Sequence, residues 1–116
     1  MGKLTTHVLD TSAGRPAAGV AWSITGEDAA DNPICSGVTN SDGRADGPIL
    51  EGSAFTSGTY ELRFSVGDYF RRQGVSLESP LFLDIVVIRF GISDASEHYH
   101  VPLLVSPFGY STYRGS

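Results

Sequence analysis

Residues 60–66, Tyr-Glu-Leu-Arg-Phe-Ser-Val, decide the fold class of this chain. Apolar side chains stand at every second position of this stretch, from Tyr60 to Val66, and polar ones lie between them. Successive side chains of a strand point to opposite faces, so this period predicts a strand with one buried face. The stretch therefore favours a β-protein.

Further strand candidates lie on both sides of this stretch. Residues 82–90, Phe-Leu-Asp-Ile-Val-Val-Ile-Arg-Phe, are rich in β-branched and aromatic side chains and predict a well-buried strand. Five other segments have a similar character: 4–10, 20–25, 34–38, 98–105 and 108–113. Turn residues separate them, including 10–16 and Asp42-Gly43, and only 68–73 resembles a helix, which Gly74 would end. Short strands between frequent turns predict an all-β sandwich or barrel.

Size and composition fit one domain over residues 1–116. A chain of 116 residues with 41% hydrophobic residues can bury one substantial core. Charged residues make up only 18%, against an average of about 25%. A small domain has much surface to hydrate, so this sparse charge indicates that part of the surface meets another subunit.

Charge and cysteine content exclude several classes of protein. Eight basic and 13 acidic residues give a net charge of −5, which argues against a nucleic-acid or anionic-membrane binder. No apolar run approaches the roughly 20 residues of a membrane span, and residues 1–6 do not resemble a signal peptide. The only cysteine, Cys35, lies in an apolar segment and is expected in the core rather than as a nucleophile. These features favour the cytoplasm, with the periplasm or peroxisome left open if a leader was removed.

The alternation also predicts which way the histidines point. In residues 98–105 the odd positions are apolar and form the expected core face, which leaves His98, His100 and Pro102 on the opposite face. His7 likewise lies opposite the apolar face of the first strand. Pro102 has no N–H to donate to a ladder, so this strand is predicted to be an edge strand or to be bulged there.

Motif searches with these residues do not select a reaction. His98 and His100 could form half of a metal site, but no third ligand or cysteine cluster completes it, so a metal is not expected. No Gly-X-Ser-X-Gly elbow or glycine-rich phosphate loop is present. Taken singly, His98 and Arg44 are expected to be solvated side chains. Composition and periodicity alone thus predict an all-β domain, oligomeric, with outward-facing histidines.

Three sequence motifs resemble those of a known family. Residues 98–116, HYHVPLLVSPFGYSTYRGS, closely resemble the C-terminal signature of the 5-hydroxyisourate hydrolases, the transthyretin-related enzymes of urate breakdown. Residues 4–10, LTTHVLD, resemble the opening motif of that family, and residues 39–44, TNSDGR, match its third segment. The resemblance extends over essentially the whole chain, and a Tyr-Arg-Gly-Ser ending is highly specific.

The resemblance implies a fold and an assembly. The fold would be a transthyretin-like β-sandwich of two four-stranded sheets with one short helix. The family forms homotetramers, as dimers of dimers, with active sites in the channel between dimers. That arrangement would account for the low charge content and for the non-core face of the strands that carry the histidines.

The resemblance also implies site residues. The family's catalytic positions fall on His7, Arg44, His100 and Ser116, with Arg44, Tyr113 and Ser116 against the substrate; Arg114 belongs to the same tail motif, and His98 lies outside the catalytic set. The implied reaction is hydrolysis of 5-hydroxyisourate to 2-oxo-4-hydroxy-4-carboxy-5-ureidoimidazoline, by water attack at C6 that opens the N1–C6 amide. Histidine suits the proton transfer and arginine the developing oxyanion. No cofactor is expected, because the ring is already activated.

Two other functions remain open. A non-catalytic carrier of small aromatic ligands could use the same transthyretin-like fold, since a fold does not fix a function. The hormone carrier of this fold lacks both the His7-Arg44-His100 set and the Tyr-Arg-Gly-Ser ending, which favours the enzyme. An all-β adhesion or structural domain would leave that ending unexplained.

Overall fold

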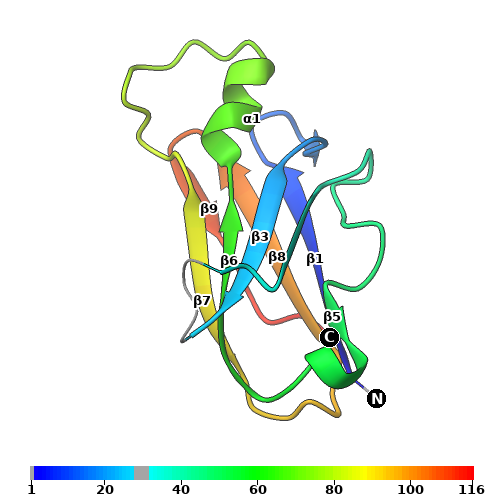
Figure 1. The fold of residues 1–116 in the computed structure, drawn as a ribbon. Coiled ribbons are helices and arrows are strands. Elements are labelled where there is room, and N and C mark those ends of the chain that lie inside the picture. Colours follow the sequence, from blue (N-terminus) through cyan, green and yellow to red (C-terminus); the bar gives the residue numbers. More distant parts are fainter. Residues whose placement is uncertain (1, 28–31) are drawn as a thin grey trace.

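Two β-sheets packed face to face form the molecule (Figure 1). The computed structural model describes residues 2–27 and 32–116. One sheet has the order β2-β1-β8-β9, with β5 also paired to β1: β1 Lys3–Asp10, β2 Arg15–Pro16, β5 Leu50–Glu51, β8 Tyr99–Ser106 and β9 Gly109–Ser111. The other has the order β4-β3-β6-β7: β3 Ala21–Gly26, β4 Cys35–Val38, β6 Gly58–Phe64 and β7 Val86–Ile92. A 3-10 turn, η1 (Gly52–Ala54), and a helix, α1 (Val66–Arg72), complete the described elements. The predicted transthyretin-like sandwich is confirmed, although β5 enlarges one sheet.

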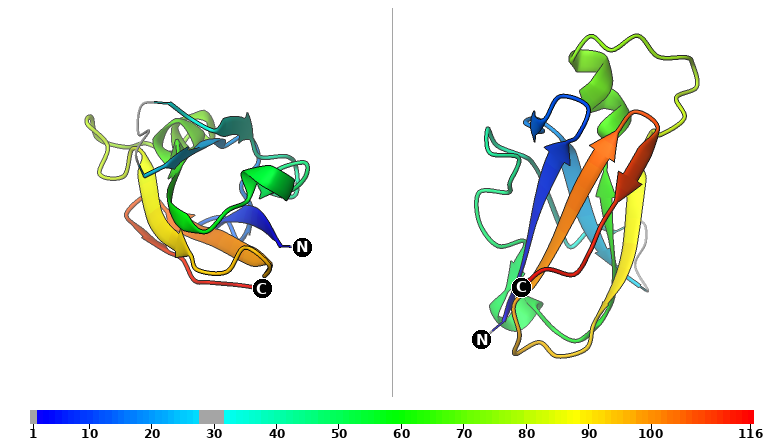
Figure 2. Two further views of the ribbon diagram at one scale, coloured as in Figure 1. Left: turned by 60° about the horizontal axis from the view of Figure 1, so that its bottom comes forward. Right: turned by 180° about the vertical axis from the view of Figure 1, so that it is seen from behind.

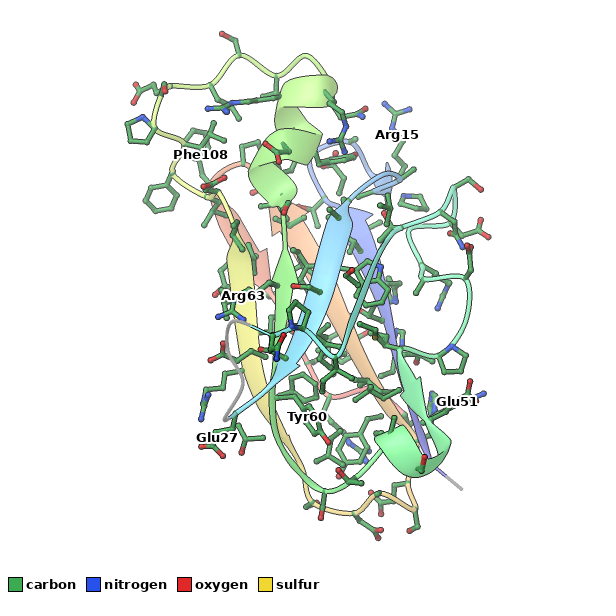
Figure 3. All side chains as sticks on the ribbon, viewed as in Figure 1. Arg15, Glu27, Glu51, Tyr60, Arg63 and Phe108 are labelled. Carbon is green, nitrogen blue, oxygen red and sulfur yellow. The ribbon has the colours of Figure 1, made fainter. Side chains whose placement is uncertain are left out.

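The core lies between the sheets and follows the predicted alternation. On β8 the odd positions are buried, with Tyr99 5% exposed and Leu103 fully buried, and Leu4 and Val8 on β1 are fully buried as well. Figure 3 labels side chains at the two ends of the sandwich, with Arg15 at the end that carries α1 and Glu51 at the opposite end. The sheets thus use one face for the core and leave the other face of β1 and β8 free for polar side chains.

Strands β1 and β8 run parallel at the centre of their sheet. Their register places Thr5 beside His100 and His7 beside Pro102. The C-terminal tail then returns along β8 and ends at the same end of the sandwich as the N-terminus (Figure 2). Residues from both ends of the sequence are therefore brought to one outer face.

The strand predicted over 60–66 lies two residues earlier, at Gly58–Phe64, and the helix also begins two residues earlier than predicted. Strand β6 ends at Phe64, and Val66 is the first residue of α1 rather than the last residue of the strand. Val66 is fully buried at the start of the helix, and a residue on the core face of a strand would also be buried, so alternation alone could not separate strand from helix there. Gly74, with a φ of 80°, follows the helix as predicted.

The prediction of a well-buried strand over 82–90 is wrong in both position and burial. Strand β7 covers Val86–Ile92, and among the described strands it pairs with β6 alone, in a ladder that ends with Phe64 opposite Val86. Residues before Val86 therefore have no neighbour among the described strands, and the Phe82 and Ile85 side chains are 73% and 52% exposed. The apolar run belongs in part to the surface.

The prediction that Pro102 marks an edge or a bulge is also wrong. Strand β8 lies between β1 and β9. On the β9 side, Leu104 pairs with Ser111 and His100 bridges to Gly115, and both pairs keep the same register. Pro102 falls between them, where the ladder is interrupted, and its carbonyl accepts a hydrogen bond of 2.7 Å from the Thr112 hydroxyl. The missing N–H is tolerated because no residue of the described strands pairs with Pro102 on that side.

The remaining boundaries differ from the predictions by one to a few residues. Strands β4 and β9 are shorter than the segments 34–38 and 108–113. Cys35 packs partly buried against the core, its Sγ–H donates to the Ile49 carbonyl at 3.3 Å, and burial raises the pKa of its thiol. That placement confirms the expected packing role. Among the described helices, none is long and apolar enough to span a membrane.

Candidate active site

A pair of histidines stands on the outer face of the β1–β8 ladder. His7 Nδ1 and His100 Nε2 are 2.6 Å apart, and the ring planes are inclined by only 23°. The ring centroids are 4.8 Å apart, which is the separation of two imidazoles joined edge to edge rather than stacked face to face. The contact is therefore a hydrogen bond close to the plane of both rings, in which one nitrogen donates and the other accepts.

The other nitrogen of His100 also has a partner. His100 Nδ1 lies 2.7 Å from the hydroxyl of Thr5, its neighbour across the ladder. The same hydroxyl lies 3.4 Å from His98 Nε2. His98 is half-buried and its Nδ1 is buried without a partner among the described residues, so the prediction of a simply solvated His98 is wrong.

A tight turn delivers Arg44 to the same face. The Asn40 side-chain oxygen accepts from the backbone N–H of Asp42 (2.9 Å) and of Arg44 (3.1 Å). Gly43 adopts a φ of 73°, and a Cβ there would lie 2.4 Å from the Val8 carbonyl, so only glycine fits. The Gly43 carbonyl accepts from the Val8 N–H at 2.7 Å, and a bridge joins Arg44 to His7. The predicted Asp42-Gly43 turn therefore anchors Arg44 beside the histidine pair.

Both histidines are held in their neutral form. Burial lowers the pKa of His7 below 6.5, and the Arg44 guanidinium lowers it further. Burial also lowers the pKa of His100, followed by the charges of His7, Arg44 and His98. A neutral imidazole beside a fixed cation can accept a proton from water at neutral pH, which is the property that a general base requires.

The C-terminal tail is fixed against the pair through its backbone. His100 and Gly115 exchange two backbone hydrogen bonds, of 3.1 Å and 2.7 Å, and a Cβ at Gly115 would lie 3.2 Å from the His100 Cβ. Arg114 reinforces this clamp, since its guanidinium lies 4.2 Å from the centroid of the Tyr99 ring and donates to Glu97 at 2.9 Å. Ser116, the next residue, is thereby kept near His100.

The structure brings together most of the predicted site residues. His7, His100 and Arg44 form one cluster, and Ser116 follows the clamped Gly115. Tyr113 and Arg114 instead line a cavity of about 250 Å³ along β7, together with Ile88 and Phe90. Thr5 was not predicted, although its place two residues before His7 on the same strand face was a signal that it would lie there.

Within residues 2–27 and 32–116, no three His, Cys, Asp or Glu side chains are grouped as metal ligands. The cluster offers imidazoles, hydroxyls and one guanidinium. Such groups can bind a polar planar molecule, move a proton and stabilise an oxyanion.

Comparison with known proteins gives a consistent result. A sequence model of the HIUase/Transthyretin family matches residues 4–115. The chain is 60% identical to 5-hydroxyisourate hydrolase 2 of Rhizobium meliloti over 118 residues, which is 99% of this chain and 97% of that protein. Klebsiella pneumoniae 5-hydroxyisourate hydrolase superposes with a TM-score of 0.83 at 35% identity, over the full length of both chains. Sea bream transthyretin, in complex with thyroxine, gives a TM-score of 0.84 at 28% identity, over 97% of this chain and 94% of that one. The chain belongs to the HIUase/Transthyretin family.

Proposed function

We propose that this chain is an enzyme that hydrolyses 5-hydroxyisourate in urate catabolism. The observation that carries this function is the cluster of His7, His100 and Arg44, in which two neutral imidazoles are hydrogen-bonded edge to edge beside a guanidinium. A relative named 5-hydroxyisourate hydrolase is 60% identical to the chain over almost its whole length.

The chemistry of the substrate suits this cluster. Opening the N1–C6 amide needs a water made nucleophilic near neutral pH and stabilisation of the negative charge that develops on the C6 oxygen. One imidazole of the pair takes the proton from the water, and the hydrogen bond between the rings orients it. Arg44 holds the flat, partly anionic ring and stabilises the oxyanion, and Ser116 donates a hydrogen bond to substrate or water. No cofactor takes part in this scheme.

A homotetramer, built as a dimer of dimers, is part of the proposal. Strands β7 and β9 each pair on one side only among the described strands, and both carry exposed apolar side chains, such as Val87 (40%) and Tyr110 (47%). Phe82 and Phe108, whose ring centroids are 6.1 Å apart, extend this apolar surface. Surfaces of this kind mark protein interfaces. The half-exposed histidine pair would gain a dry environment if a second dimer covered it. A cytoplasmic location is also proposed, supported by a single cysteine that packs against the core.

The test is a coupled assay in one cuvette. Urate and urate oxidase generate 5-hydroxyisourate in place, and its ultraviolet absorbance decays slowly without a hydrolase. The purified protein should accelerate that decay, and size-exclusion chromatography with light scattering should report a tetramer. Folded protein with no effect on the decay would refute the hydrolase function. Tight binding of thyroxine without hydrolysis would then support the carrier function, which the structural similarity to transthyretin suggests.

A further inference from the structure

Thr5 lies at the start of a hydrogen-bonded chain that ends at the open face of the site. Its hydroxyl contacts His100 Nδ1 at 2.7 Å, and His100 Nε2 contacts His7 Nδ1 at 2.6 Å. No other described residue hydrogen-bonds the remaining nitrogen, His7 Nε2. Three groups are therefore coupled in series, and only the last atom of the series is free to meet a ligand.

A neutral imidazole carries one N–H and one lone pair, so the direction of each hydrogen bond fixes the next. If the Thr5 oxygen accepts from His100 Nδ1–H, then His100 Nε2 must accept from His7 Nδ1–H. His7 Nε2 is then left with a lone pair. If Thr5 donates instead, every bond reverses and His7 presents an N–H at Nε2. The state of Thr5 therefore decides whether the open end of the chain is a base or a donor.

The charge of Arg44 favours the first arrangement. The contacts of Thr5 permit both, because its hydroxyl can accept from one ring nitrogen and donate to the other, at 2.7 Å from His100 and 3.4 Å from His98. A bridge holds Arg44 beside His7, and its guanidinium disfavours positive charge on that ring. Because His7 Nδ1 is turned to His100, a lone pair at His7 Nε2 is attracted to the cation, whereas an N–H there would be repelled by it.

We propose that Thr5 is a positioning residue whose hydroxyl accepts from His100 Nδ1–H, and thereby places the basic lone pair of the site on His7 Nε2. This inference rests on the proposed hydrolase function and assigns the proton acceptor within it. In the reaction, water transfers a proton to His7 Nε2 as its oxygen bonds to C6. His7 becomes an imidazolium that keeps its Nδ1–H on His100, and it later returns the proton to the leaving N1. In this scheme Thr5 acts through His100 and does not itself react with substrate or water.

The first experiment determines the tautomer of His100 without using substrate. The chain has three histidines, so two-bond proton–nitrogen correlation spectra of ¹⁵N-labelled protein at a pH of about 8, where imidazoles are neutral, contain few ring signals. The expected result is a proton on Nδ1 of His100 in the wild type, and a mixture or a shift to Nε2 in Thr5→Val. Wild-type His100 protonated at Nε2, or an unchanged tautomer in Thr5→Val, would overturn the proposal.

The second experiment separates positioning from folding. Thr5→Val should lower kcat about tenfold with little change in KM, since a misplaced lone pair impairs proton transfer but not binding. Thr5→Ser keeps the hydroxyl and should restore kcat to within about twofold of wild type. Thr6→Val is the matched control, because the Thr6 hydroxyl donates to the Val101 carbonyl at 2.6 Å from the buried side of the same strand. Thr6→Val should leave kcat unchanged.

Equal losses of kcat in Thr5→Val and Thr6→Val would make the effect structural and overturn the proposal. If Thr5→Val did not fold, two results would still test the proposal. They are the position of the His100 proton in the wild type and the kcat of Thr5→Ser. A wild type without hydrolase activity would refute the proposed function, whereas the tautomer spectra would still report whether Thr5 orders the histidine pair.

Discussion

Strand β1 carries two polar clusters that differ in how completely they are hydrogen-bonded. At its end, Asp10 is 3% exposed and both of its oxygens are used. Oδ1 accepts from the Ser12 hydroxyl (2.5 Å) and from the backbone N–H of Ser12 (3.0 Å) and Ala13 (3.1 Å), and Oδ2 accepts from the Tyr69 hydroxyl (2.8 Å). In the middle of the strand, the histidine pair leaves one ring nitrogen without a partner among the described residues.

The difference separates a structural cluster from a chemical one. Burial and the hydrogen bond to Asp10 raise the pKa of Tyr69 to about 12, so Tyr69 remains a donor and the cluster has one stable state. The histidines lie beside Arg44 and have pKa values below 6.5, so they are neutral and can accept a proton near neutral pH. The buried Asp10 cluster uses its hydrogen-bonding groups to hold β1 against α1. The half-exposed histidine cluster has a ring nitrogen without a partner among the described residues, and that nitrogen can react.

The largest expected effect sharpens this contrast. His100→Asn keeps a polar side chain of similar position but removes the imidazole that orients His7. We expect kcat/KM for 5-hydroxyisourate to fall by about a thousandfold, within the range for loss of acid–base catalysis. The coupled urate oxidase assay measures this loss, and light scattering should show the assembly unchanged. Normal turnover by this variant would exclude His100 from the reaction.

Removal of residues 113–116 should have the next largest effect. The tail supplies Ser116 and the backbone clamp of Gly115 on His100. We expect kcat/KM to fall about a hundredfold, because misplacement of catalytic groups by about 1 Å has costs of this size. The melting temperature should fall by only a few degrees, since Tyr113 is 59% exposed and contributes little to the core. A collapsed melting temperature with unchanged specific activity would contradict a role for the tail in the site.

Asp10→Asn should act in the opposite way, on stability and not on catalysis. The amide cannot accept all the hydrogen bonds that the two carboxylate oxygens receive, so one buried donor loses its partner. We expect the free energy of unfolding to fall by about 2 kcal/mol, measured by urea denaturation. The kcat should stay within about twofold of wild type, and a larger loss would link this cluster to the site.

The two clusters should lose their contributions to stability in two different pH ranges. The folded protein lowers the histidine pKa values, so the unfolded chain binds more protons below pH 6.5 and stability decreases as the pH falls through that value. Burial alone would raise the pKa of Asp10, but hydrogen bonds from Ser12, Tyr69 and Ala13 hold it below 3.8. Its contribution is present above pH 3.8 and is lost as the pH falls through the folded pKa.

Urea denaturation at a series of pH values measures both losses. His100→Asn should reduce the loss of stability below pH 6.5, where His7 still contributes, and should leave the loss below pH 3.8 unchanged. Asp10→Asn should remove the loss below pH 3.8 and leave the loss below pH 6.5 unchanged. The rate should follow the histidines alone, with the acid limb of kcat/KM below pH 6.5. An acid limb above that pH would show that the histidines are not held neutral in the site.

The sequence predicted much of the fold because core residues recur at every second position along a single strand, which is a local pattern. Alternation in 60–66 and 98–105 correctly assigned Tyr60, Leu62, Val101 and Leu103 to the interior. It failed at Val66 and over 82–85, where a residue's burial or apolar character did not reveal which strands lie beside it. Pro102 failed for a related reason, since a gap in the neighbouring ladder is a property of the tail, far along the chain.

The candidate site shows the same division. The sequence alone determined which residues have the chemistry, because imidazole, guanidinium and hydroxyl groups are fixed by residue type, and their motifs matched a family. Only the tertiary structure decided that the parallel pairing of β1 and β8 places Thr5 against His100 and His100 against His7. More than 90 residues separate these partners in the sequence, so no local period relates them. The order of the three groups, and with it the position of the free nitrogen, comes from the register of two distant strands.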